Sequence, residues 1–161
     1  MLVLKSSVCV DASPQIVWEY LARVENVTHW VPAINKAWCE DNQSRGEGTV
    51  RHCKLDKFAI RETFIEWDEG RSFKYIATGA PMIKSASNRW SLEEINGQTL
   101  ITSYAEIIVK GGVFGRLLEP MIFLATKYAL PNALAPLKYY IETGKAFEGD
   151  AKDLPLAAAF C

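Results

Sequence analysis

The dipeptide Asn96-Gly97 constrains the fold most, because it separates two runs of alternating residues in the stretch NRWSLEEINGQTLITSYA. This pair favours a two-residue type I′ turn, in which both central residues take a positive φ. Such a turn fixes which residues of the two strands face each other. It places Trp90 opposite Ser103 and Leu92 opposite Ile101.

Two earlier turns extend the same pattern toward the N-terminus. Glu69-Gly70 in EWDEGRSF and Asp56-Lys57 in KLDKFA each connect two runs with strand character. Direct cross-strand partners lie on the same side of a sheet. The predicted partners are Arg51 with Glu62, Cys53 with Ile60, Phe64 with Tyr75, Glu66 with Phe73, and Asn88 with Ala105.

The three turns agree on a single apolar face. The inner set is Cys53, Leu55, Ile60, Phe64, Phe73, Tyr75, Ala77, Trp90, Leu92, Ile101, Ala105 and Ile107. The outer set is His52, Lys54, Arg61, Lys74, Arg89 and Glu106. We therefore predict a meandering antiparallel sheet with one buried side, made of an opening strand LVLKSSVCV and strands near 34–41, 48–56, 59–68, 71–78, 84–95 and 98–110.

Two short helices are expected between the first two strands. Ser13 and Pro14 form a typical helix start, with Ser13 as the N-cap and Pro14 in the first helical position. The spacing of the apolar residues in this helix directs four of them to the core: Ile16, Val17, Tyr20 and Leu21. A second helical turn is predicted in VTHWVPAI.

The only long element left to cover the apolar face is a helix from about 113 to 144. It contains Pro120, Pro131 and Pro136, and an interior proline costs a helix about 3 kcal/mol relative to alanine. We expect packing on a curved sheet to hold this helix together. The alternative is two or three shorter helices, with a break at Pro131.

Composition indicates one domain over residues 1–144 and a loosely held tail over 145–161. The chain has 161 residues, 49% of them hydrophobic, and a net charge of −1. This charge balance argues against nucleic acid or an anionic membrane as the main partner. No run is long enough to span a bilayer, and the early charges Lys5 and Asp11 leave no room for a signal peptide's apolar core. A cytoplasmic protein is expected.

The four cysteines, Cys9, Cys39, Cys53 and Cys161, show no paired spacing, and there are only two histidines. A tetrahedral zinc site requires paired ligands a few residues apart, so neither a metal nor a cofactor is predicted. The cysteines are interpreted as small buried residues in a reducing compartment.

The order of elements resembles the START-like or helix-grip superfamily, also called SRPBCC, and within it the polyketide cyclase/dehydrase and coenzyme-Q-binding branch. The stretches that carry the resemblance are VCVDASPQIVWEYLARVENVTHWVPAI, GEGTVRHC, IRETFIEWDEGRSFKYIATG, NRWSLEEINGQTL and LKYYIETG. The resemblance implies an α+β fold with about seven strands wrapped around the C-terminal helix. It also implies a cavity between sheet and helix for a lipid, polyketide, quinone or similar hydrophobic ligand.

The predicted register makes Arg51 and Glu62 neighbours on the inner face, near Tyr75 and Asn88. A few polar groups in an apolar wall are typical of a small-molecule site, although a structural ion pair is the alternative. The predicted ligand-binding residues are Trp30, Arg51, Glu62, Phe64, Phe73, Tyr75, Asn88, Trp90, Ser103 and Met121.

Three functions remain open. The preferred one is binding or carriage of a small hydrophobic molecule. The first alternative is a cyclase or dehydratase, in which Glu62 is the general base and Arg51 or Tyr75 stabilises an oxyanion. The second is a non-enzymatic interaction module, comparable to a co-chaperone, that uses the outer sheet face or the helix. The sequence does not indicate the oligomeric state.

Overall fold

The computed structural model describes the backbone of residues 1–161 and every side chain except those of residues 113, 116, 125, 126 and 128–132. Its seven-stranded antiparallel sheet has the order β1-β7-β6-β5-β4-β3-β2. The strands are β1 Leu2–Val10, β2 Lys36–Cys39, β3 Val50–Lys54, β4 Ala59–Asp68, β5 Ser72–Thr78, β6 Ile83–Ile95 and β7 Gln98–Val109. The helices are α1 Pro14–Ala22, α2 Gly112–Thr143 and three 3-10 helices, η1 Val24–His29, η2 Glu40–Asn42 and η3 Ala151–Asp153.

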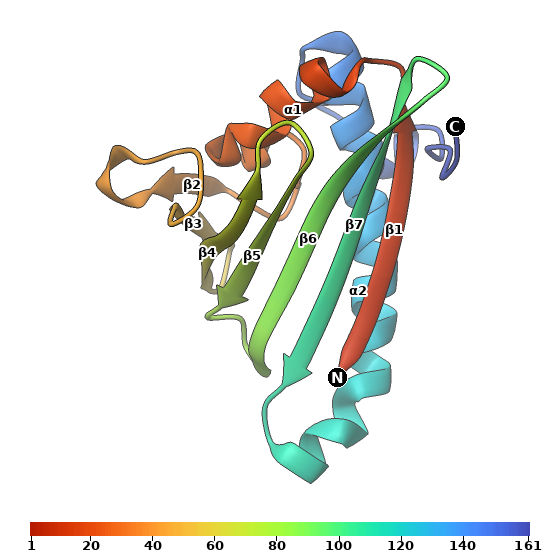
Figure 1. Cartoon of the computed structure of the whole chain (residues 1–161). Coiled ribbons are helices and arrows are strands. Elements are labelled where there is room, and N and C mark those ends of the chain that lie inside the picture. Colours follow the sequence, from red (N-terminus) through yellow and green to blue (C-terminus); the bar gives the residue numbers. More distant parts are fainter.

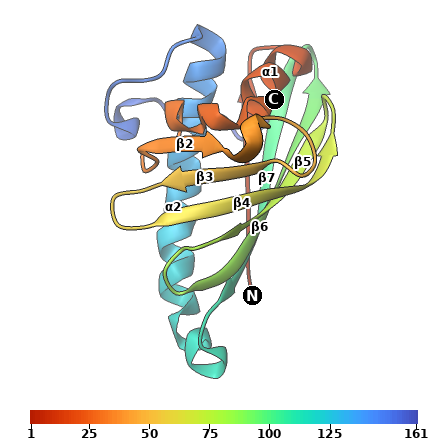
Figure 2. The ribbon, with the colours of Figure 1, turned by 90° about the vertical axis from the view of Figure 1, so that its left-hand side faces the viewer.

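The sheet curves around α2 as expected for the α+β fold. Figure 2 shows β2, β3 and β4 passing across the helix, while β7 runs along it. The inner face carries most of the core, which includes Cys53, Phe64, Phe73, Trp90 and Ile101, all buried. In the part of the chain with described side chains, no helix is long and apolar enough to cross a membrane.

The predicted turns set the observed register. Asn96 and Gly97 have φ values of 52° and 81°, as a type I′ turn requires. Trp90 pairs with Ser103 across β6 and β7, and the other predicted partners are also found: Arg51 with Glu62, Cys53 with Ile60, Phe64 with Tyr75, and Asn88 with Ala105.

One predicted pair is wrong. A β-bulge between Phe64 and Glu66 shifts the register, so that Glu66 faces Lys74 and Trp67 faces Phe73. The extra residue reverses the alternation of side chains beyond it. Glu66 therefore lies on the outer face, where it pairs with Arg89, and Trp67 packs against the core.

The orientation of α1 also differs from the prediction. Ser13 accepts a hydrogen bond from the Ile16 backbone N–H and caps the helix, as predicted. Ile16, however, is 51% exposed. The buried residues are Val17, Trp18, Leu21 and Ala22. The second helical turn is the 3-10 helix η1, which begins before the predicted stretch.

Helix α2 is continuous through all three prolines, so the alternative of several shorter helices is wrong. Gly111, with φ 94°, precedes it, and Gly144, with φ 72°, ends it. The last turns are buried against the core through Leu134, Leu137 and Ile141. The side chain of Pro131 lies outside the described residues.

The first half of α2 does not cover the sheet as predicted. Figure 1 shows its first turns extending beyond the ends of β1 and β7. Large apolar side chains there are exposed: Phe114 80%, Leu117 77%, Met121 59% and Leu124 54%. Packing on the sheet therefore does not account for Pro120, which is exposed, whereas Pro136 is buried among the packed turns.

The C-terminal tail returns to the first strand. Cys161 forms a disulfide with Cys9, from which it is separated by 152 residues, and the Cys9 N–H donates to the Ala158 carbonyl at 2.8 Å. The interpretation of all four cysteines as unpaired is therefore wrong for these two, because chain reversal brings together residues that sequence spacing keeps apart. Cys39 and Cys53 are free thiols.

Candidate functional site

Arg51 and Glu62 form a buried ion pair on the inner face of the sheet. They face each other across β3 and β4, and the Arg51 Nε donates to Glu62 Oε2 at 2.5 Å. Their side chains are only 7% and 9% exposed. The Arg51 Nη1 donates to the Val24 carbonyl at 2.5 Å, which connects η1 to the sheet.

Neighbouring groups stabilise the charge of Arg51. Burial, the largest single influence, would lower the pKa of its guanidinium, but the charge and hydrogen bond of Glu62 together with Cys53 and Tyr75 outweigh burial and raise that pKa above its ordinary value. The guanidinium also lies 5.4 Å from the ring centre of Phe64 and 5.5 Å from that of Tyr75. Arg51 is therefore held as a cation over two neighbouring aromatic rings.

Cys53 is a second donor to Glu62. Its thiol donates to Glu62 Oε2 at 3.4 Å, and burial raises its pKa to about 12. A thiol with so high a pKa is a poor nucleophile, because thiolate is the reactive form. Cys53 therefore contributes packing and a weak hydrogen bond rather than reactivity.

A chain of hydrogen bonds lies beside the ion pair on β5, β6 and β7. The Ser103 hydroxyl donates to Asn88 Oδ1 at 2.9 Å, and Asn88 Nδ2 donates to the Tyr75 oxygen at 3.3 Å. Burial and the charge of Glu62 raise the pKa of Tyr75 to about 12. Tyr75 is thus a neutral phenol whose oxygen already accepts a hydrogen bond, which leaves its own proton for another acceptor.

A cavity of about 310 Å³ adjoins both groups. Its walls come from the inner face of the sheet, from η1 and the loop after it, and from α2. The lining residues with described side chains are Leu4, Val27, Trp30, Val31, Ile34, Arg51, Glu62, Tyr75, Ala77, Ala86, Ser87, Asn88, Trp90, Ala105, Ile107 and Ala133. Among these residues the lining is mostly apolar, and Arg51 and Glu62 are the charged members.

The predicted ligand-binding residues fall into three groups. Those that line the cavity are Trp30, Arg51, Glu62, Tyr75, Asn88 and Trp90. Phe64, Phe73 and Ser103 are buried beside it without lining it. Met121 was placed incorrectly: it is 59% exposed, because it lies on the half of α2 that extends past the sheet.

The predicted ligand-binding residues did not include the alanines that leave room for the cavity. Ala77 pairs with Ala86 across β5 and β6, Ala105 lies on β7, and Ala133 lies on α2. Small side chains at inner-face positions leave space that aromatic residues fill elsewhere. Ala77 and Ala105, both on the predicted inner face, were the available signal.

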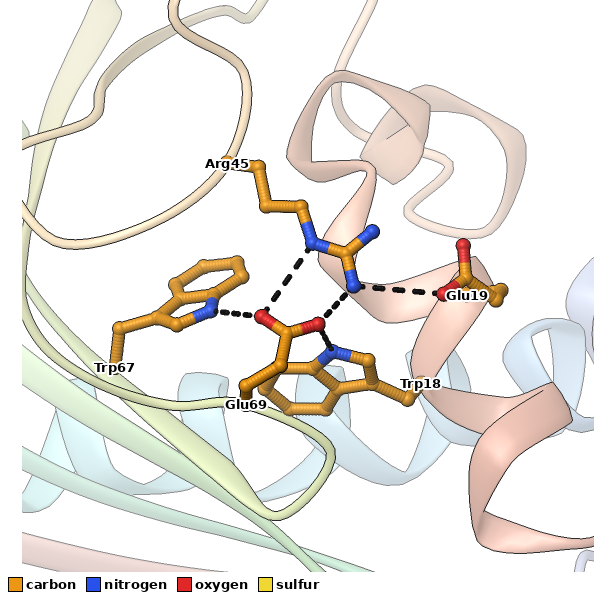
Figure 3. Close-up of polar contacts among 5 residues, drawn as sticks. All are labelled: Trp18, Glu19, Arg45, Trp67 and Glu69. Atoms are coloured by element: carbon orange, nitrogen blue, oxygen red, sulfur yellow. Dashed lines mark hydrogen bonds and ion pairs between the residues drawn. The ribbon is translucent and has the colours of Figure 1, made fainter.

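A second polar cluster lies outside the cavity. The Glu69 carboxylate accepts hydrogen bonds from the indoles of Trp18 and Trp67, each at 2.7 Å, and pairs with Arg45, which also reaches Glu19 (Figure 3). The hydrogen bonds from Arg45 and Trp67 lower the pKa of Glu69 to about 2. This cluster ties the loop after η2 to α1 and to the β4–β5 turn. Among the described residues, no group of three potential ligands could hold a metal ion.

Comparison with known proteins adds independent information. A family model described as "Polyketide cyclase / dehydrase and lipid transport" matches residues 1–142. A search of curated protein sequences finds no match.

Solved structures resemble the fold at low sequence identity. The ZhuI aromatase/cyclase from Streptomyces sp. R1128 is 16% identical with a TM-score of 0.65, covering 91% of this chain and 99% of its own. A START superfamily protein from Mycobacterium smegmatis is 17% identical with a TM-score of 0.65, covering 82% and 93%. Ara h 8.0201 is 14% identical with a TM-score of 0.64, covering 87% and 97%. Such identities establish a shared fold and nothing finer.

Proposed function

Because the chain belongs to the polyketide cyclase/dehydrase and lipid transport family, we propose that it binds and carries a small hydrophobic molecule between the sheet and α2. The observation that carries this proposal is the cavity of about 310 Å³ beside the buried Arg51–Glu62 pair. Its volume lies within the range of small-molecule sites, at the lower end.

The polar groups narrow the class of ligand. Tyr75 directs a phenol donor to the cavity, and two hydrogen bonds, to Glu62 and to the Val24 carbonyl, fix the plane of the Arg51 guanidinium. Two fixed donors in an apolar wall suit a ligand oxygen that only accepts, such as a ketone or quinone carbonyl. A purely hydrocarbon ligand would accept a hydrogen bond from neither Arg51 nor Tyr75.

Binding of the neutral probe N-phenylnaphthylamine tests the proposal. We expect its fluorescence to rise with the parent protein and to rise much less with Ala105→Leu, which fills the cavity. Ala59→Leu is the matched control, because Ala59 is an exposed alanine on β4. Native mass spectrometry of the purified protein would then identify a co-purifying carbonyl compound. Equal probe binding by all three proteins would contradict the proposal.

A cyclase or dehydratase is the second candidate. The fold similarity to an aromatase/cyclase and the donor orientation of Tyr75 favour it. In that role Glu62 would accept a proton while Arg51 and Tyr75 stabilise the developing enolate oxygen. Glu62→Gln should abolish turnover of a poly-β-keto thioester while probe binding persists. Absence of turnover in the parent would leave carriage alone.

The interaction module is less well supported. Such a module would have a filled interior and an exposed apolar patch. The exposed apolar residues of α2 fit that description, but the cavity does not.

A cytoplasmic location also stays a prediction, and the Cys9–Cys161 disulfide is more typical of oxidising compartments. Cell fractionation would decide between them.

A further inference from the structure

A second pocket, of about 590 Å³, lies beside the edge strand β1, and none of the residues with described side chains lines both this pocket and the cavity. Figure 1 shows the C-terminal tail lying beside β1, and residues of both line the pocket. Its lining residues with described side chains are Lys5, Ser6, Ser7, Leu134, Ala135, Ala151, Lys152, Leu154, Pro155, Leu156, Ala157, Ala159 and Phe160. Strand β1, helix α2 and the tail thus supply one wall each.

The tail wall is held in place at its far end. The Cys9 N–H donates to the Ala158 carbonyl at 2.8 Å, and the Cys9 carbonyl accepts from Lys138 Nζ at 2.8 Å. The disulfide then joins Cys9 to Cys161 with Cα atoms 5.2 Å apart. These contacts all lie at one residue of β1. The tail beyond η3 is thus fastened to β1 at this residue, while η3 packs on α2 and Ala157 packs against the core.

The lining has the character of a site for an amphipathic anion. Leu156 and Phe160 are 96% and 85% exposed, although both border the pocket. Apolar side chains held this way offer surface that a hydrocarbon chain would cover. No acidic residue is among the lining residues with described side chains.

The two lysines of the pocket differ in their availability. Lys152 pairs with Asp150 at 3.4 Å. Lys5 is exposed on the first strand and has no ion pair in the part of the chain whose side chains are described. Ser6 and Ser7, which follow Lys5 on β1, also line the pocket. An anionic head group would therefore meet an uncompensated cation at Lys5.

We propose that this pocket is a second ligand site, which takes an apolar chain ending in a carboxylate, and that the Cys9–Cys161 disulfide assembles it. Reduction by a dithiol would convert the disulfide to two thiols, with the dithiol oxidised to its own disulfide, and would free the tail wall. Binding at this site therefore depends on the redox state. It does not rest on the function proposed for the cavity.

Titration with dansyl-undecanoic acid tests the proposal. The Ala105→Leu protein serves as the background, because its filled cavity leaves only the tail pocket to bind the probe. Ala86→Leu replaces it if the first variant does not fold. We expect one probe molecule per chain in this background. Adding Lys5→Glu should weaken binding about tenfold, whereas Lys57→Glu, at an exposed turn, should leave it unchanged.

The redox dependence has its own control. Cys161→Ser should remove binding in the same background, and dithiothreitol should do so in the protein that retains Cys161. Dithiothreitol should have no further effect on Cys161→Ser. Failure of the background protein to bind the probe would overturn the proposal. So would binding that is indifferent to Lys5→Glu and to Cys161→Ser.

Discussion

Breaking the Arg51–Glu62 pair from one side should be far more damaging than replacing both partners. Removing one member of a buried ion pair leaves an uncompensated charge, which typically costs about 3–5 kcal/mol. Replacing both by apolar residues of similar volume is often neutral or stabilising. The two single variants and the double variant Arg51→Met/Glu62→Leu therefore form an informative cycle.

The environment of each group sets where its variant falls in that range. Arg51→Met leaves the Glu62 carboxylate with only the weak Cys53 thiol among the hydrogen bonds described for it, so we expect a loss near 5 kcal/mol. Glu62→Leu leaves Arg51 with the Val24 carbonyl and two aromatic faces. We expect a loss near 3 kcal/mol for this variant.

Urea unfolding at neutral pH measures all four proteins. If the losses were additive, the double variant would lose about 8 kcal/mol, which is most of a typical domain's stability. We expect it instead to unfold within about 1 kcal/mol of the parent. An additive loss would refute the reasoning, because it would mean that each side chain stabilises the fold independently of the other.

The pH dependence provides an internal check. In Arg51→Met, a carboxyl group buried without a cation has a raised pKa in the folded state. Its protonated form favours the fold, so the loss of stability in this variant should become smaller as the pH falls from 7 toward 5.

If the double variant is stable but no longer binds N-phenylnaphthylamine, the pair serves recognition rather than folding.

Three further variants follow from single groups. Thr49→Val should raise the free energy of unfolding by about 1 kcal/mol in urea titrations, because the fully buried Thr49 hydroxyl has no partner among the described residues. The parent should lose stability as the pH falls from about 4.5 to about 2, because folding lowers the pKa of Glu69. Glu69→Gln should remove this pH-dependent part of the stability, and thermal melts across that pH range measure the difference. Between pH 10 and 12 the parent should lose stability, because its unfolded state releases the Tyr75 phenol proton that its folded state retains. Tyr75→Phe should lose less stability over the same pH range in urea titrations.

The register of the sheet could be predicted because turn chemistry determines it locally. Asn96 and Gly97 both tolerate the positive φ of a type I′ turn, which most residues disfavour, and the alternation of side chains then carries the alignment along both strands. The Arg51–Glu62 contact follows from the same logic at the Asp56-Lys57 turn. The bulge after Phe64 could not be predicted. The sequence FIEW fits a regular strand as well as a bulged one, and nothing near it in the sequence distinguishes the two.

The tail could not be predicted for a different reason. Its anchor depends on where a chain reversal brings Cys161, and that is a property of the complete fold rather than of any stretch of sequence. The orientation of α1 falls between these cases. The predicted buried face is displaced by one residue, so that Trp18 is buried in place of Ile16. The Trp18 indole donates to Glu69, which lies 51 residues away on the β4–β5 turn.

The hollow itself is the feature that a substitution can test most directly. Ala105 is 7% exposed and borders the cavity. Ala105→Leu would bury about three additional carbons, worth up to about 2.4 kcal/mol at 0.8 kcal/mol per carbon, less about 0.5–1 kcal/mol of side-chain entropy. If the cavity is empty, the variant should therefore be more stable than the parent by about 1.5 kcal/mol in urea unfolding. It should also no longer bind N-phenylnaphthylamine. If the interior is filled, the same change overpacks the core and costs about 1–3 kcal/mol. The sign of the change thus distinguishes a cavity kept open for a ligand from an ordinary core.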